Sequence, residues 1–184
     1  MTSFQSFLAV LTLVVLWVIF TYNRLITLKT RTQEAWSDID VQLKRRYNLI
    51  PNLVEAVKGY AGHERQLFEN VTKARTQAMG AQTMKEHSEG ENFLSSTLKS
   101  LFAVTENYPD LKASQNFLEL QRELRDAEDK IQSARRFYNG NVRDLNIKID
   151  RFPEKIIASM LHFKKMEFFE LKEEIVKEVP KVNF

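Results

Sequence analysis

The N-terminal part of the chain has no charged side chain before Arg24. Residues 7–20 read FLAVLTLVVLWVIF, in which a single threonine interrupts the apolar run. As a helix, the 19 residues 4–22 would be roughly 29 Å long, which matches the ~30 Å hydrocarbon core of a bilayer. We therefore predict that residues 1–23 form a transmembrane anchor whose span lies at about 4–22.

A cleaved signal peptide is the alternative interpretation of this run. Such a peptide has a basic segment before the apolar run and a small-residue cleavage site after it. Here no Lys or Arg precedes the run, which ends in WVIFTYNRL, and Trp17 and Tyr22 suit the headgroup level of a bilayer. These features favour an uncleaved single-pass anchor.

The charges after the anchor indicate its orientation. Arg24, Lys29 and Arg31 follow the span, whereas no Lys or Arg precedes it. Basic flanks stay on the cytoplasmic side of a membrane. We expect the N-terminus outside and the rest of the chain in the cytoplasm.

The composition favours an all-α fold. The 184 residues include only 5 Gly and 4 Pro, too few for the many turns of an all-β protein, while 43% apolar and 28% charged residues are typical of a folded chain. The 27 basic and 24 acidic residues alternate in sign and sum to +3, so nucleic-acid binding is not expected. The absence of Cys excludes disulfides, thiolate metal sites and Cys nucleophiles.

A helical stripe follows the anchor. Its apolar positions recur every three or four residues, at Leu25, Leu28, Thr32, Ala35, Ile39, Leu43 and Tyr47. No Gly or Pro separates this stripe from the apolar run, so we expect the anchor to continue into the first domain helix without a linker. Pro51 predicts the end of that helix, with a corner at residues 48–52 that Asn48 and Asn52 cap.

Three further helices are expected. A second stripe covers residues 53–78 and includes Gly59 and Gly62 within the helix, and the polar residues 80–92 are predicted to be the longest loop. A shorter helix should follow at residues 93–105. The strongest period lies in residues 113–151, where apolar positions are seven apart, at Phe117, Leu124, Ile131, Tyr138, Leu145 and Phe152.

The last of these patterns predicts a helix of about 60 Å that ends at Phe152–Pro153. Its seam favours the core of a bundle over a separate dimeric coiled coil, because the other amphipathic helices also need a partner. A short helix and a tail should follow. We therefore predict a helical bundle domain at residues 24–165 and a C-terminal tail at residues 166–184.

Two blocks of the sequence resemble a known family. Residues 35–54, AWSDIDVQLKRRYNLIPNLV, continue into VKGYAGHE and resemble the signature of the LemA family of bacterial membrane proteins. A second block, ENYPDLKASQNFLELQRELRDAEDKIQSARRFYN with LN and FP after it, is similar to the other half of that pattern, so the resemblance covers about residues 5–165. It implies a transmembrane helix and a bundle of long antiparallel helices at the bacterial inner membrane. A relative in magnetic bacteria is associated with forming the magnetosome membrane.

A search for chemistry finds no catalytic pattern. The three histidines, His63, His87 and His162, lie on different segments without metal-ligand spacing, and no phosphate loop or nucleophile elbow occurs. Asp38 and Asp40 flank a buried position and point to opposite sides of a helix, so they cannot act as an acid–base pair. We expect no catalytic residue, no metal and no cofactor.

Candidate partner-binding residues fall into two groups. Polar residues surround the expected corner, namely Asp38, Asp40, Lys44, Arg45 and Arg46, and aromatic residues lie near the C-terminus, namely Phe163, Phe168 and Phe169. The polar group has a structural alternative, since it could bond the backbone of the corner and complement the helix dipole. Both interpretations stay open.

Two classes of function fit the sequence. One is a membrane-anchored scaffold or partner-docking protein, which organises membrane by self-association or by binding a protein partner. The other is a membrane-bound enzyme or signalling accessory with an unrecognised site. A bundle on an anchor without catalytic residues favours the first class. We therefore expect that the protein is not an enzyme and has no small-molecule substrate. We expect its partners to be the bilayer and another protein chain.

Overall fold

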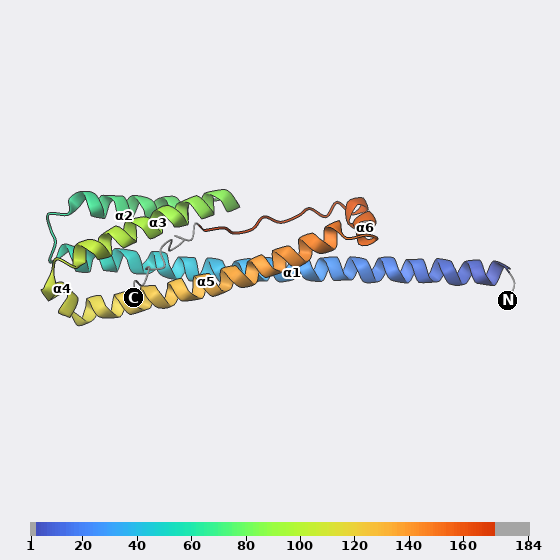
Figure 1. Ribbon diagram of the computed structural model, residues 1–184, viewed down its shortest axis with the longest axis horizontal. Coiled ribbons are helices and arrows are strands. Elements are labelled where there is room, and N and C mark those ends of the chain that lie inside the picture. Colours follow the sequence, from blue (N-terminus) through green and yellow to red (C-terminus); the bar gives the residue numbers. More distant parts are fainter. Residues whose placement is uncertain (1–2, 172–184) are drawn as a thin grey trace, which may run out of the picture.

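Residues 3–171 of the chain are described by a computed structural model, and within this range all regular structure is helical (Figure 1). The all-α fold is therefore confirmed. Six helices follow one another within residues 3–171: α1 (Ser3–Lys58), α2 (Arg65–Met79), α3 (Met84–Thr105), α4 (Pro109–Ala113), α5 (Gln115–Asp150) and α6 (Glu154–Met160). Residues 172–184 of the predicted tail lie outside the described range.

Helices α1 and α5 run antiparallel and form the long axis of the bundle (Figure 1). The predicted stripes make this contact, because every position of the α1 stripe from Leu25 to Tyr47 is buried. On α5 the heptad positions from Phe117 to Leu145 are buried as well. The side chain of Ile149 is still buried, whereas that of Phe152, the last predicted heptad position, is 79% exposed. The long helix and its place in a bundle core are confirmed.

Helices α2 and α3 form a hairpin beside the C-terminal half of α1 (Figure 1). Their buried leucines and alanines join the same core as the α1 and α5 stripes. The two helices touch at Gly90, where an added Cβ would lie 2.9 Å from the Cα of Ala78. Gly90 therefore permits this close approach.

Pro51 does not end α1, so the predicted corner at residues 48–52 is wrong. The helix continues through Pro51 to Lys58. Proline has no N–H to donate to the carbonyl of Tyr47, four residues earlier. In the structure Nε of Arg75 on α2 donates to that carbonyl at 2.7 Å, so a neighbouring helix satisfies the group that Pro51 leaves open. Asn48 and Asn52 lie within the helix and cap nothing.

Two other boundaries also differ from the expectation. The chain leaves the helix at Gly59 and α2 begins only at Arg65, so Gly59 and Gly62 lie in a connection. The predicted loop 80–92 is short, because α3 already begins at Met84. The hydroxyl of Thr83 accepts from the backbone N–H of Glu86, whose carboxylate accepts from the N–H of Thr83. This capping box starts α3 in a stretch that has no apolar period.

The N-terminal part of α1 projects from the bundle alone (Figure 1). Its 18-residue window of highest mean hydropathy, 2.2, is almost entirely exposed. By length and composition α1 is long and apolar enough to cross a membrane. The expected continuity is confirmed, because one helix contains both this apolar stretch and the first bundle stripe.

Candidate functional site

A buried ion-pair network joins three helices at the level of Arg46. The Arg46 guanidinium on α1 pairs with Glu91 of α3 and Glu128 of α5, and the Tyr47 hydroxyl donates to Glu91. Arg46 is 1% exposed and Glu91 is 0% exposed. Burial raises the pKa of the Tyr47 phenol to about 12, so this hydroxyl stays protonated as a donor to the carboxylate. The network therefore fixes the position of α3 on the α1–α5 pair.

The other polar candidates lie along α1 and not at a corner. Arg45 is half-buried and pairs with Glu123 and with Asp126 of α5, the latter at 2.8 Å. Nζ of Lys44 lies 2.6 Å from the carboxylate of Asp40, four residues earlier on the same helix. Asp38 is exposed. Of the five candidates, Arg45 and Arg46 thus hold the bundle together, whereas Asp38 and Lys44 face solvent.

An aromatic cluster surrounds Trp36 in the middle of the bundle. The indole contacts the rings of His87 on α3 at 5.0 Å, Tyr138 on α5 at 5.5 Å and Phe169 at 5.5 Å between ring centroids. Burial lowers the pKa of His87, although the carboxylates of Asp40 and Glu86 act in the opposite direction. The imidazole is therefore held in its neutral form beside the indole.

Two asparagines of α5 bind the extended segment that follows α6. The side-chain amide of Asn139 donates to the carbonyl of Phe169 and accepts from its N–H, at 3.0 and 2.9 Å. Asn146 makes the same pair of bonds with Met166, at 2.9 and 3.0 Å. The Tyr138 hydroxyl donates to the carbonyl of Glu167 at 2.9 Å. We call Asn139 and Asn146 the asparagine clamp, because they hold the backbone of this segment against α5.

The aromatic candidates near the C-terminus have three different surroundings. Phe169 is fully buried beside Trp36, and Phe163 is half-buried against the ring of Tyr22 on α1, 6.3 Å away. Phe168 is 42% exposed. Only Phe168 therefore presents much of its ring to a partner, and the first residues of the predicted tail pack on the bundle.

A groove of about 500 Å³ runs between α3 and α5, with Arg46, Lys99, Glu106 and Glu128 among its lining residues. The guanidinium of Arg46 is already held by Glu91 and Glu128. Within residues 3–171, no group of three or more His, Asp or Glu residues is arranged to hold a metal ion. Arg46 and Glu128 of this groove are thus engaged in holding helices together.

Sequence reasoning missed Glu91, Asn139 and Asn146. Glu91 lies in the stretch that was taken for a loop, so its burial could not be anticipated. The two asparagines are seven residues apart, each one position after a seam residue, Tyr138 or Leu145. That spacing places them on one edge of the α5 stripe and is the signal that would have identified them.

The fold defines a class of protein: a long antiparallel helical bundle whose first helix extends into an exposed apolar stretch. The sequence profile described as the LemA family matches residues 35–184. The chain belongs to the LemA family. The resemblance of the two sequence blocks is therefore confirmed.

Several curated relatives are similar to this chain. Magnetosome protein MamQ 2 of Paramagnetospirillum magneticum is 27% identical over 177 residues, which are 82% of this chain and 65% of the relative. Magnetosome protein MamQ of Magnetospirillum gryphiswaldense is 25% identical over 174 residues, with 80% and 64% covered. Protein LemA of Metamycoplasma hominis is 28% identical over 152 residues, with 82% and 69% covered. The chain thus spans slightly less than two thirds of the MamQ proteins.

Proposed function

We propose that this protein is a single-pass membrane scaffold whose bundles dock against one another at the bacterial inner membrane. The observation that carries the proposal is the continuity of α1, in which an exposed apolar stretch and a bundle stripe share one helix of 56 residues. A helix without a hinge holds every bundle at the same height above the bilayer. Confinement to the membrane also raises the effective concentration of weak contacts.

The bundle lies on the cytoplasmic side in this proposal. Arg24, Lys29 and Arg31 are exposed on α1 directly after the apolar stretch. Basic residues close to a span favour the cytoplasmic side. The N-terminus is then outside.

The docking surface lies at the level of Trp36 and Tyr138, whose ring centroids are 5.5 Å apart. Asp38 is two residues from Trp36 on α1, and Arg136 is two residues from Tyr138 on α5, and both are exposed. Copies held at one height by their anchors therefore bring Asp38 of one bundle to the level of Arg136 of the next. Such a pair fixes the register of neighbouring bundles.

Phe168 supplies the apolar part of this surface. It borders a groove of about 590 Å³ that Arg136, Arg143 and Glu170 also line. An exposed aromatic ring beside arginines is a common anchor in protein interfaces. Arg46 and Phe169 are not part of the surface, since both are buried within their own chain.

A role in organising membrane fits the relatives. Three of the similar proteins carry the name magnetosome protein. An array of bundles in register would impose its geometry on the bilayer that the anchors share. This is the function that we propose for the present chain.

The test is a charge exchange in the full chain, fused to a fluorescent protein after Phe184 and counted by single-molecule photobleaching in bilayers. We expect clusters for the wild type, and mostly single copies for Asp38→Arg or Arg136→Asp alone. The double variant should regain clusters, because the pair is re-formed with opposite signs. Glu55→Lys, near the C-terminal end of α1, is the matched charge control and should leave clustering unchanged.

Two results would contradict the proposal at different levels. Clusters that survive both single charge reversals would show that the surface at Asp38 and Arg136 is wrong. A wild-type chain that stays monomeric and copurifies with no protein would remove the scaffold function and reopen the search for an enzymatic site.

A further inference from the structure

Apolar side chains gather on the outer face of α6. Phe152 is 79% exposed, Ile156 52% and Met160 70%. Ile156 and Met160 are four residues apart and therefore share one face of the helix. The opposite face is also apolar, since Ile157 and Ala158 are buried in the bundle. The bundle covers only one apolar face of this seven-residue helix, so packing within the bundle does not explain the apolar residues on its outer face.

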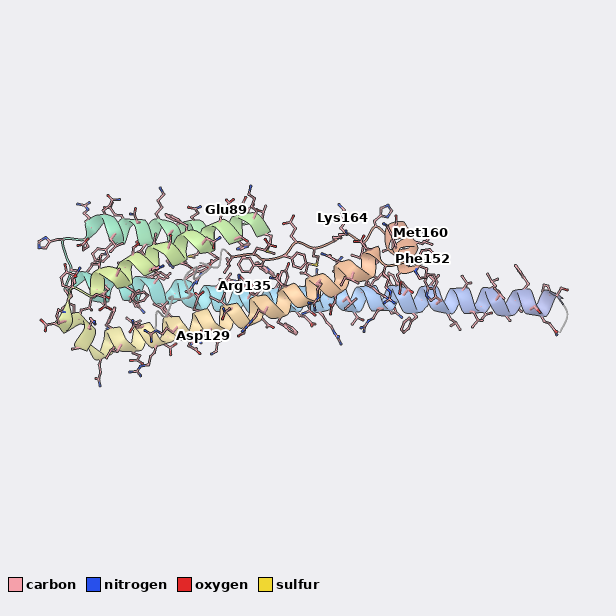
Figure 2. All side chains as sticks on the ribbon, in the orientation of Figure 1. Glu89, Asp129, Arg135, Phe152, Met160 and Lys164 are labelled. Atoms are coloured by element: carbon pink, nitrogen blue, oxygen red, sulfur yellow. The ribbon has the colours of Figure 1, made fainter. Side chains whose placement is uncertain are left out.

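This outer surface lies where the bundle ends and α1 continues alone. Figure 2 shows Phe152 and Met160 at the end of the bundle from which the apolar part of α1 projects. The first buried position of α1 is Thr21, and the ring of Tyr22 contacts Phe163, directly after α6. Helix α6 thus sits at the end of the stretch assigned to the membrane span.

Basic side chains surround the same end. A recess of about 510 Å³ is lined by Lys29 of α1 and by Lys164 and Lys165 of the segment after α6, together with Tyr22 and Phe163. Lys155 is exposed on α6 itself. The nearby carboxylates are already paired, Asp150 with Lys165 at 2.5 Å and Glu154 with Lys148. Lys29, Lys155 and Lys164 are exposed around this end of the bundle.

We infer that α6 is a second membrane contact, which lies in the headgroup region and binds anionic lipid through the lysines around it. This inference rests on the proposed insertion of α1 in the bilayer. An exposed apolar face with lysines beside it is the pattern of a helix in the membrane interface. Anionic phosphate headgroups complement the lysines, and the acyl boundary takes up Phe152, Ile156 and Met160.

The contact of α6 with the membrane would fix the orientation of the bundle relative to the bilayer, which the span alone does not fix. A single helix can tilt and rotate in the bilayer, and interfacial anchors determine which tilt it adopts. Helix α6 lies on one side of α1, so its insertion selects one tilt direction. Neighbouring bundles would then present the same faces to one another.

The test uses single cysteines with nitroxide labels in the full chain, which has no native cysteine. Met160→Cys reports on α6 and Val10→Cys reports on the span. Tyr60→Cys is a control at an exposed site just after α1, away from the proposed docking surface. The protein is placed in vesicles of phosphatidylcholine with phosphatidylglycerol. Faster spin relaxation of a label in the presence of oxygen shows that the label is exposed to lipid. Faster spin relaxation in the presence of a water-soluble nickel chelate shows that it is exposed to solvent.

We expect the label at residue 160 to be accessible to oxygen but not to nickel, as at residue 10, and the label at residue 60 to show the reverse. Accessibility to nickel at residue 160 with a lipid-exposed residue 10 would overturn this inference and leave the anchor intact. Low accessibility to both reagents would also overturn it, because the face would then be covered by protein. A solvent-exposed residue 10 would overturn the proposed function itself.

The lipid charge is tested with Lys155→Gln/Lys164→Gln. Each lysine near an anionic surface contributes about fivefold to the bound-to-free ratio, so the double variant should lower the inserted fraction of α6 by about 25-fold at low salt. Vesicles of phosphatidylcholine alone should lower it for the wild type as well. An inserted fraction that is unchanged in both comparisons would refute recognition of the anionic headgroup.

Discussion

The two halves of α1 belong to one helix but have opposite surroundings. Up to Phe20 nearly every side chain is exposed, whereas from Leu25 to Val57 every third or fourth side chain is buried. The first half is apolar on all faces and the second on one face. An all-round apolar helix needs an apolar environment on every side, and a striped helix needs a protein partner on one side.

The contrast explains how one element can serve as both anchor and core. In the second half the polar residues between the stripe positions pair with other helices, as Arg45 does with Glu123 and Asp126. The first half has no charged residue to pair. Substitutions should therefore affect the stability of the bundle strongly in one half and hardly at all in the other.

The largest effect is expected at Arg46. Arg46→Ala would leave the carboxylate of Glu91 buried without its cation, which costs about 3–5 kcal/mol of unfolding free energy. Urea unfolding of the full chain in detergent measures the loss. The double variant Arg46→Met/Glu91→Leu removes both charges and should lose clearly less than Arg46→Ala. Equal losses of unfolding free energy in the single and the double variant would show that the unpaired charge of Glu91 does not cause the destabilisation.

The next prediction compares a substitution in the buried seam of α5 with one in the projecting half of α1. Ile131 is fully buried in the bundle, so Ile131→Ala should cost about 2–5 kcal/mol of unfolding free energy. Val10 is 60% exposed outside the bundle, and Val10→Ala should change that free energy by less than about 0.5 kcal/mol. Similar costs for the two substitutions would mean that the apolar half of α1 also packs on protein.

The same two patterns show what the sequence could predict. The buried stripe from Leu25 to Tyr47 was predicted correctly, because it has one dominant period. Residues 4–22 form an exposed apolar helix, as their uniformly apolar composition indicates. The predicted end of α1 at Pro51 and the predicted loop over residues 80–92 were wrong for a shared reason. Arg75 bonds the carbonyl that Pro51 leaves without a donor, and a capping box starts α3 at Met84. Neither interaction is visible in the pattern of apolar residues.

The functional residues were harder to predict than the helices. Arg46 was a candidate for a docking surface, because its burial depends on Glu91 in the N-terminal turns of α3, which the sequence pattern assigned to a loop. Polar side chains become structural or functional only through partners that are distant in sequence. The asparagine clamp is of this kind, since its ligand is a backbone 20 to 30 residues away.

A smaller effect is expected from the asparagine clamp. Asn139→Ala removes both hydrogen bonds to Phe169, each of which contributes about 1 kcal/mol. Amide hydrogen exchange at Phe169 should become faster while the core of α5 stays protected. Asn141→Ala is the matched control, because that amide donates to the carbonyl of Phe137 within its own helix. Unchanged exchange at Phe169 in Asn139→Ala would mean that the aromatic contacts alone hold the segment.

The smallest effect is a pH dependence from His87. Its pKa is lowered in the folded bundle, so below about pH 6.5 the unfolded chain takes up a proton that the folded chain resists. Stability should therefore fall as the pH decreases through this range. His87→Gln should flatten the change of the urea midpoint between pH 7.5 and 5.5. An identical change in both proteins would assign the pH dependence to other groups.

The central claim is that α1 passes from its apolar half into the bundle without a hinge. Val15→Cys/Val41→Cys places spin labels at one exposed residue in each half, and pulsed dipolar spectroscopy in lipid nanodiscs measures their separation. Twenty-six helical residues at 1.5 Å predict a single narrow distribution near roughly 39 Å. A broad distribution, or one centred well below this distance, would show a bend between the halves and contradict the account.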